Sequence, residues 1–294
     1  MKIIDSHHHV WLKKDLPWLT GPNQPRIFGA YDQIKRDYLI EEFLSDTCNL
    51  NIEKSIYVQT NWDTTKFEDE VIWVEKISAT NDGLPNAIVC FCDLRQTDVR
   101  NDLDKLKKYN LIRGIRQQIH WHKNKAYRFS DKKSVPLEKN FRKNIGYLKD
   151  YNLSFDLQIF PNQFATSLSL IDEFYEVQFI LEHAGMLEDT SKNGKIFWED
   201  NMRELAKRKN VAVKISALGT FIRRNSTEHI TWILNKTVDI FGIDRCMFGS
   251  NFPIEKLWTT YAELLKSYFI STSKWSKKSK ENFFYNNAVR YYKL

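Results

Sequence analysis

The sequence predicts a TIM-like (β/α)8 barrel of the α/β class, formed as a single domain by residues 1–294. Two observations lead to this prediction. Short apolar, β-branched runs alternate with longer amphipathic stretches, which indicates βα units and a parallel sheet. Eight such runs occur, with no internal repeat, low-complexity segment or linker between them. Eight βα units are typical of a closed barrel.

The predicted strands are short runs rich in strand-forming residues, as in the first of them, KIIDSHHH. They cover residues 2–9, 55–60, 87–94, 113–119, 154–160, 178–183, 211–217 and 245–251.

Helix-period patterns separate these strands, with apolar residues recurring on one face of each stretch. Seven predicted helices lie between strands and two follow the last strand. They cover residues 38–50, 67–80, 99–110, 137–151, 162–174, 198–209, 227–241, 255–268 and 277–292.

Residues 10–37 form an unusually long connection between the first strand and the first helix. Long loops inside compact domains are usually functional or disordered. This one is rich in aromatic residues, among them Trp11, Trp18, Phe28 and Tyr31. We therefore expect it to be ordered and to form a wall or lid over the site. The alternative is a rigid cover over one end of the barrel.

The composition, with 42% hydrophobic and 28% charged residues, is that of a globular protein. The net charge of +7 and the isoelectric point near 9.0 would permit an anionic partner. The lysines, however, are interspersed with acids as on solvated helix faces, and only residues 274–280 form a basic cluster. We therefore expect no nucleic-acid partner.

The amino-terminal residues lack the apolar core of a signal peptide, and no apolar run approaches the ~20 residues of a membrane span. These patterns predict a cytoplasmic protein with no membrane partner. The four cysteines are sparse and lack paired CxxC spacing, so we expect neither a disulfide framework nor a cysteine zinc site.

His7 and His9 form the most informative pair of residues. Strand side chains alternate between faces, so Asp5, His7 and His9 share one face and His8 lies on the other. Two imidazoles at a strand end can bind a divalent metal or a substrate oxyanion, with Asp5 orienting one of them from behind. The alternative is a histidine-rich terminus or a tag remnant.

The predicted sixth strand ends in LEHAG. Alternation places Glu182 and His183 on opposite faces. We expect His183 to point into the barrel lumen and Glu182 to pair with a helix. The alternative for His183 is a buried core histidine without function.

The segments IDSHHHVW, ILEHAGM, VKISALG and CMFGSNFP, in this order, resemble the amidohydrolase superfamily and its metal-dependent-hydrolase type of barrel. The closest likeness is to the branch of sugar-lactone and pyrone-dicarboxylate lactonases, which YVQTNW and GIRQQIH also fit. The likeness extends from residue 4 to about residue 257.

This resemblance implies roles for particular residues. His7 and His9 resemble the pair that binds metal in many members, and His183 resembles the histidine on strand six. Arg116 resembles residues on strand four that contact the substrate. Asn251 stands where the family normally has an aspartate that activates water.

An amide at position 251 cannot take a proton from water, as a carboxylate can. If one divalent metal ion, zinc or manganese, is bound, it can lower the pKa of water to about 7, and Asn251 would orient that water. If the protein is metal-free, His183 is the remaining base. Two further alternatives are lost hydrolysis and a purely structural turn at Asn251.

Four further residues are candidate substrate contacts. Lys214 could hold a carboxylate or polarise a carbonyl, and Gln59 could donate a hydrogen bond. Trp121 and His122 could line a pocket for a ring. The alternatives are an outward-facing lysine and simple loop packing.

The sequence therefore predicts a hydrolase that opens a lactone of a sugar acid or related carboxylate by attack of water on the ring carbonyl. Its partner is a small-molecule substrate, and a homodimer is left open. A related decarboxylase or hydratase and a non-catalytic small-molecule-binding barrel are the alternative functions.

Overall fold

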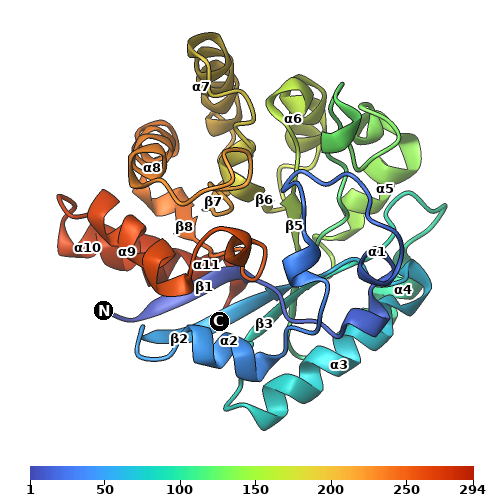
Figure 1. Ribbon diagram of the computed structural model, residues 1–294. Helices are drawn as coiled ribbons and strands as arrows, with labels where there is room; N and C mark the ends of the chain where they lie inside the picture. Colours follow the sequence, from blue (N-terminus) through green and yellow to red (C-terminus); the bar gives the residue numbers. More distant parts are fainter.

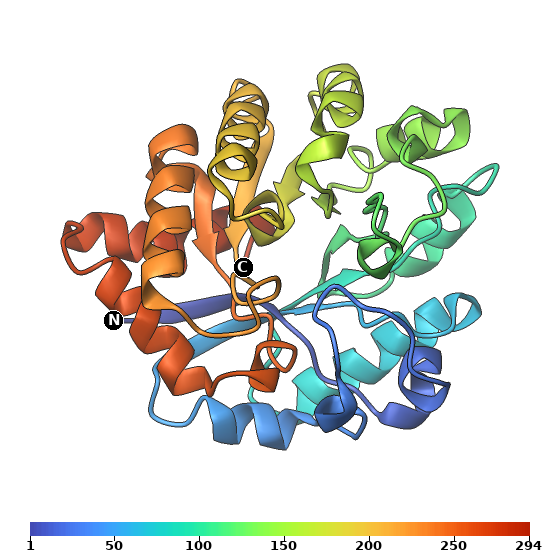
Figure 2. The same cartoon turned by 45° about the horizontal axis from the view of Figure 1, so that its top comes forward.

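The computed structural model describes residues 1–294 and contains eight parallel strands arranged in the order β1 to β8. The strands surround a central axis and the helices form the outer layer (Figures 1 and 2). The predicted (β/α)8 barrel is confirmed. The strands are β1 (Ile3–His8), β2 (Ile52–Val58), β3 (Ala87–Cys90), β4 (Ile112–Ile115), β5 (Ser154–Leu157), β6 (Phe179–Leu181), β7 (Val211–Ile215) and β8 (Cys246–Phe248).

The barrel is completed where the chain just beyond β8 meets β1. The backbone N–H of Asn251 donates to the carbonyl of His7, and the N–H of His9 donates to the carbonyl of Phe252, both at 2.7 Å. These two bonds place Asn251 beside the histidines of β1.

The helices follow the predicted order, and two of them have the predicted bounds. They are α1 (Pro17–Thr20), α2 (Ile40–Asp46), α3 (Phe67–Thr80), α4 (Arg100–Leu106), α5 (Lys139–Tyr147), α6 (Phe164–Glu173), α7 (Lys192–Ala206), α8 (Thr227–Phe241), α9 (Tyr261–Ser271), α10 (Lys277–Glu281) and α11 (Asn287–Tyr292). None of these helices combines the length and the apolar character that crossing a membrane requires.

The differences in helix bounds have local causes. Helix α7 begins earlier than predicted because the Ser191 side chain accepts a hydrogen bond from the N–H of Gly194 and so caps the helix. Helix α9 begins at Tyr261 because Thr260 caps it in the same way. The predicted helix over 277–292 is interrupted by a π-helical turn, Asn282–Asn286.

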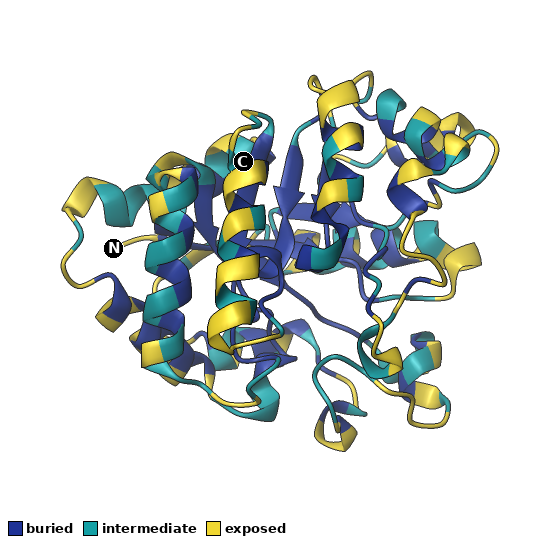
Figure 3. Cartoon of the chain, turned by 90° about the horizontal axis from the view of Figure 1, so that it is seen from above, coloured by how far each residue is buried: buried dark blue, intermediate teal, exposed yellow.

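The hydrophobic core has two parts. The larger part lies between the strands and the surrounding helices, whose outer faces are exposed (Figure 3). The smaller part fills the amino-terminal end of the barrel, where Tyr292 of α11 packs among residues such as Ile4, Val58 and Ile180. The carboxyl terminus accordingly lies near the barrel axis in Figures 1 and 2. This end of the barrel is closed by side chains.

Residues 10–37 are ordered, as predicted. Trp11 and Tyr38 exchange backbone hydrogen bonds of 2.7 and 3.0 Å, and Leu16 and Leu19 are buried. Gly29, at a φ of +80°, packs so closely that a Cβ there would lie 2.7 Å from the Arg223 guanidinium carbon. The loop therefore rests against the connection between β7 and α8.

Candidate active site

A cavity lies at the carboxyl ends of the strands, where barrel enzymes have their sites. It encloses about 720 Å³, its open mouth included. Residues 10–37 contribute Trp11, Trp18, Arg26 and Phe28 to its lining and so form one wall of this cavity. Five of the predicted site residues also line it: His9, Gln59, Arg116, His183 and Asn251.

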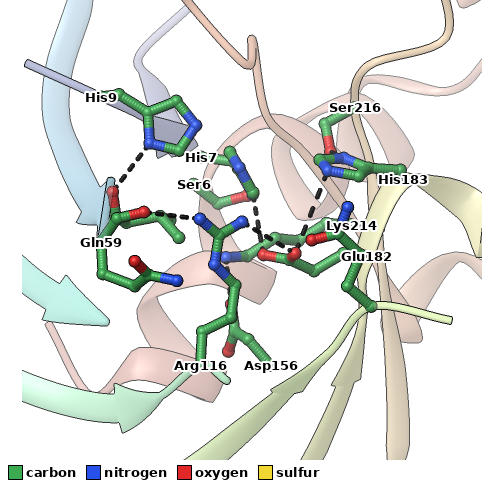
Figure 4. A network of polar contacts seen from close by, with 12 residues as sticks. Ser6, His7, His9, Gln59, Arg116, Asp156, Glu182, His183, Lys214 and Ser216 are labelled. Carbon is green, nitrogen blue, oxygen red and sulfur yellow. Dashed lines mark hydrogen bonds and ion pairs between the residues drawn. The ribbon is translucent and has the colours of Figure 1, made fainter. Parts of the chain in front are cut away.

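His7, His9 and His183 lie close together (Figure 4), and His9 and His183 line the cavity. The ring of His7 is 5.0 Å from that of His9 and 4.8 Å from that of His183, between centroids. His8 points the other way and stacks on Phe43 at 4.1 Å. The alternation of side chains along β1 therefore places His7 and His9 on one face and His8 on the other, as predicted.

Hydrogen bonds orient two of the three imidazoles. His9 Nδ1 lies 2.7 Å from the carbonyl of Val58, so this nitrogen carries the proton and Nε2 keeps its lone pair. His183 Nδ1 lies 2.9 Å from Ser216 Oγ. Nε2 of His7 is buried and has no hydrogen-bond partner.

Burial keeps the three imidazoles neutral. It lowers the pKa of His9 to about 3 and that of His183 to about 4. Burial also lowers the pKa of His7 well below its usual value, although Glu182 opposes this effect. Neutral imidazoles offer lone pairs and do not repel a cation.

Glu182 does not pair with a helix, which corrects the sequence-based expectation. Its Oε1 lies 3.1 Å from His7 Nδ1 and its Oε2 accepts a hydrogen bond of 3.1 Å from Arg116 Nη1. Burial alone would raise the pKa of Glu182, but Arg116 and His7 outweigh burial and hold it well below its usual value. A carboxylate therefore lies beneath the imidazoles.

The backbone after β6 explains this correction. The strand ends at Leu181, and His183 and Ala184 adopt left-handed conformations with φ of 56° and 48°. The alternation of faces ends with the strand, so Glu182 and His183 both reach the lumen. Strained backbone of this kind is concentrated at functional sites.

The residues present fit a divalent metal. His7, Glu182 and His183 each offer one ligand atom, and these atoms lie within 4.8 Å of one another. Nε2 of His7 is buried without a hydrogen-bond partner, and a metal ion would supply one. Imidazole nitrogens with one carboxylate oxygen form a donor set that suits zinc or manganese.

Amide side chains form one wall of the cavity. Asn61 Nδ2 donates to Gln118 Oε1, and Gln118 Nε2 donates to Gln158 Oε1, both at 2.9 Å. Gln59 lies at the end of this row, where its Oε1 accepts from the N–H of Asn61 at 2.7 Å. Such a row can recognise substrate hydroxyl groups.

Arg116 and Asn251 occupy the positions predicted for them. Arg116 Nη2 donates to the carbonyl of Gln59 at 2.5 Å, which fixes its guanidinium at the cavity wall. Asn251 has a φ of 61°, a conformation that Asn and Asp adopt more readily than other residues.

Lys214 does not line the cavity. Its Nζ lies 2.5 Å from Asp156 Oδ2, and neither side chain has any exposed surface. Its inward orientation agrees with the strand pattern, but its side chain lies one layer below the site. The predicted substrate contact is therefore corrected to an internal ion pair.

Trp121 and His122 also lie outside the cavity lining. The backbone turns after β4, so Trp121 lies beneath the Arg128 guanidinium at 4.8 Å and His122 Nε2 lies 3.6 Å from Glu188. His120, which directly follows the predicted strand 113–119, lines the cavity instead. Tyr127 and Phe129 provide the aromatic lining expected of Trp121.

Comparison with known proteins identifies the family. The family model described as amidohydrolase matches residues 4–294. The chain belongs to the amidohydrolase family. The resemblance inferred from its motifs is thereby confirmed, and the chain is a hydrolase of the amidohydrolase superfamily.

Three similar proteins illustrate the range of the relatives. The uncharacterized protein y4mH of Sinorhizobium fredii is 34% identical over 294 residues, 99% of this chain and 98% of that protein. An L-fucono-1,5-lactonase of Burkholderia multivorans is 25% identical and covers 89% of this chain and 85% of its own length. A crystal structure of an amidohydrolase from Burkholderia multivorans with bound zinc has a TM-score of 0.83, with 23% identity and full coverage of both chains.

Proposed function

We propose that this amidohydrolase opens a lactone of a sugar acid or related carboxylate by hydrolysis. The observation that carries the proposal is the convergence of His7, His183 and Glu182 beneath a cavity with an amide wall. The relatives that are named L-fucono-1,5-lactonases, at 25% and 22% identity, support the same substrate class.

The cavity suggests how a lactone would bind. The amide row formed by Asn61, Gln118 and Gln158 faces the side on which ring hydroxyl groups would lie. Arg116 would donate to the substrate through its Nε, which has no partner, because Glu182 and the Gln59 carbonyl bind only its Nη1 and Nη2. The reacting carbonyl would then lie over the imidazoles.

A metal ion would be held by His7, His183 and Glu182, whose ligand atoms converge, and His9, whose ring lies 5.0 Å from that of His7, would add a fourth ligand. When bound, a zinc or manganese ion polarises a carbonyl and lowers the pKa of water. Glu182 is ionised and the imidazoles are neutral, so these side chains need no deprotonation before they bind a cation.

The reaction requires one proton to leave water and one to reach the ring oxygen. The oxygen of water bonds to the carbonyl carbon and the ring C–O bond breaks, which leaves a hydroxy acid. Asn251 cannot accept the proton, but it can orient the water through its amide. In a metal-free protein His183 would accept the proton through Nε2 and return it to the ring oxygen.

Lactone hydrolysis and metal content should be measured on the same preparation. A panel of sugar lactones followed with a pH indicator tests the reaction, and elemental analysis tests the metal. The variant His9→Ala is expected to abolish turnover and to lower zinc or manganese content from near one per chain.

A matched control comes from the same strand. His8→Leu removes the neighbouring imidazole, which faces Phe43 and not the cavity, so its metal content and turnover should match those of the parent. Turnover without metal in both the parent and the control would support the route through His183. A panel without any turnover would contradict the proposed reaction.

A further inference from the structure

Arg26 differs from the other arginines of the cavity because it has neither a carboxylate nor a carbonyl partner. Its guanidinium lies over the ring of Trp18 at 5.2 Å and over that of Phe129 at 5.9 Å. Its Nε is buried without a hydrogen-bond partner. Burial lowers its pKa, and only the nearby Tyr31 hydroxyl opposes this effect. Two aromatic rings therefore hold a cation whose charge is not compensated.

The other two arginines of the lining are already engaged. Arg116 donates to Glu182 and to the carbonyl of Gln59. Arg128 donates to the carbonyls of His122 and Lys123, at 3.0 and 3.3 Å. Arg26 is thus the lining arginine whose whole guanidinium remains available, whereas Arg116 has only its Nε free.

The lining as a whole favours an anion. It contains three arginines and three histidines but no aspartate or glutamate. Glu182 compensates Arg116 from below, whereas no carboxylate of the lining faces Arg26. A negatively charged group inside this cavity would meet the Arg26 guanidinium and no carboxylate of the cavity lining.

The position of Arg26 separates it from the reacting end of the site. Arg26 lines the cavity and also the adjoining surface groove, together with Trp18, Asn61, Gln118 and Phe129. The groove also contains four carboxylates, of which Asp131 and Glu138 are paired with Arg95. Arg26 therefore lies at the mouth, whereas the imidazoles lie at the base. The amide row joins these two regions.

We infer that Arg26 binds a free carboxylate of the substrate. The substrate is then a hydroxylated lactone with a second, unesterified carboxyl group, as in the lactone of a sugar diacid. One carboxyl group is in the ring ester above the imidazoles, and the other meets Arg26 at the mouth. This inference rests on the proposed lactone hydrolysis and specifies the charge of its substrate.

Matched pairs of lactones test the inference. Both members of a pair have the same ring and the same hydroxyl configuration, but one carries a free carboxylate where the other carries a CH2OH group. The parent enzyme should prefer the carboxylate member. Arg26→Gln should raise KM for that member by at least about tenfold, as expected for loss of a charge-assisted pair, and should leave KM for the neutral member unchanged. Arg26→Lys should recover part of the loss. A preference for the neutral member, or an equal effect on both, would overturn the inference.

Arg128→Gln is the matched control, because it removes a second lining arginine that already binds backbone carbonyls. It should affect both members of each pair alike. Binding of ring-opened sugar diacids, measured by calorimetry, separates this inference from the proposed reaction. Diacid binding that is lost in Arg26→Gln supports the inference even if no lactone is turned over. Diacid binding that is unchanged in Arg26→Gln overturns it even if lactones are hydrolysed.

Discussion

Lys214 and Asp156 form an ion pair of 2.5 Å in which neither side chain has exposed surface. The Tyr292 hydroxyl donates to both oxygens of the same carboxylate at 2.9 Å. Strands β5 and β7 and helix α11 therefore meet at one buried charge pair. This pair forms the layer directly below the active site.

Lys214→Met should destabilise the protein by about 3–5 kcal/mol, because it leaves the Asp156 carboxyl buried without its cation. Urea denaturation would measure this loss. The double variant Lys214→Met with Asp156→Leu should recover much of the stability, since it removes both charges. If Lys214→Met instead kept the parental stability and raised KM, Lys214 would be a substrate contact.

Asn251→Asp should raise kcat by about tenfold or more if water activation limits the reaction, because a carboxylate supplies the base that the amide lacks. The left-handed backbone at this position tolerates Asp as well as Asn, so the fold should be preserved. Steady-state kinetics on the preferred lactone would measure the change. Unchanged substrate binding without turnover in either protein would indicate a binding protein rather than a weakened hydrolase.

Glu182→Gln should lower metal affinity by about 10- to 100-fold, because it removes the carboxylate that contacts His7 and leaves Arg116 without its counterion. Titration of the metal-free protein with zinc would measure this effect. Glu255→Gln is a suitable control, since it alters another fully buried glutamate that has no contact with His7. Equal affinities in all three proteins would exclude Glu182 from the metal site.

Protonation of Glu255 in the folded state should make the protein less stable as the pH rises. It is fully buried, its Oε2 accepts from Trp258 Nε1 at 2.7 Å, and burial raises its pKa to about 8. The folded state therefore holds a proton that the unfolded state loses near its usual pKa of 4.5. The associated stability is complete below pH 4.5 and is lost as the pH rises to about 8.

Thermal unfolding of the parent and of Glu255→Gln between pH 5 and 9 would test this expectation. The stability of the parent should fall relative to that of the variant over this interval, because only the parent has the Glu255 carboxyl to ionise. Parallel curves would show that Glu255 is ionised in the folded protein throughout.

The sequence predicted the barrel and the histidine site because both depend on regular periodicity. The pattern of β1 placed His7 and His9 on the lumen face and His8 on the other, and the structure agrees. Helices α3 and α8 have the predicted bounds, and α8 begins at the Ser226 cap and ends before Gly242, whose φ is 79°.

The incorrect predictions concern residues beyond the regular strands and residues whose position along the barrel axis cannot be read from periodicity. Glu182 was misplaced because the chain leaves the strand geometry at Leu181. Lys214 was expected in the cavity because alternation gives the face of a strand residue but not its layer along the barrel axis. Arg26 was not singled out, because its position depends on how a long loop folds over the barrel mouth.

The amino-terminal end of the barrel, filled by Tyr292 and the apolar residues around it, has a consequence for turnover. Substrate can enter and product can leave only through the mouth beside residues 10–37, so the two compete for one passage. A ring-opened hydroxy acid carries one negative charge more than its lactone and must move past the arginines of this passage. Accumulating product should therefore slow the enzyme by occupying the route of the next substrate.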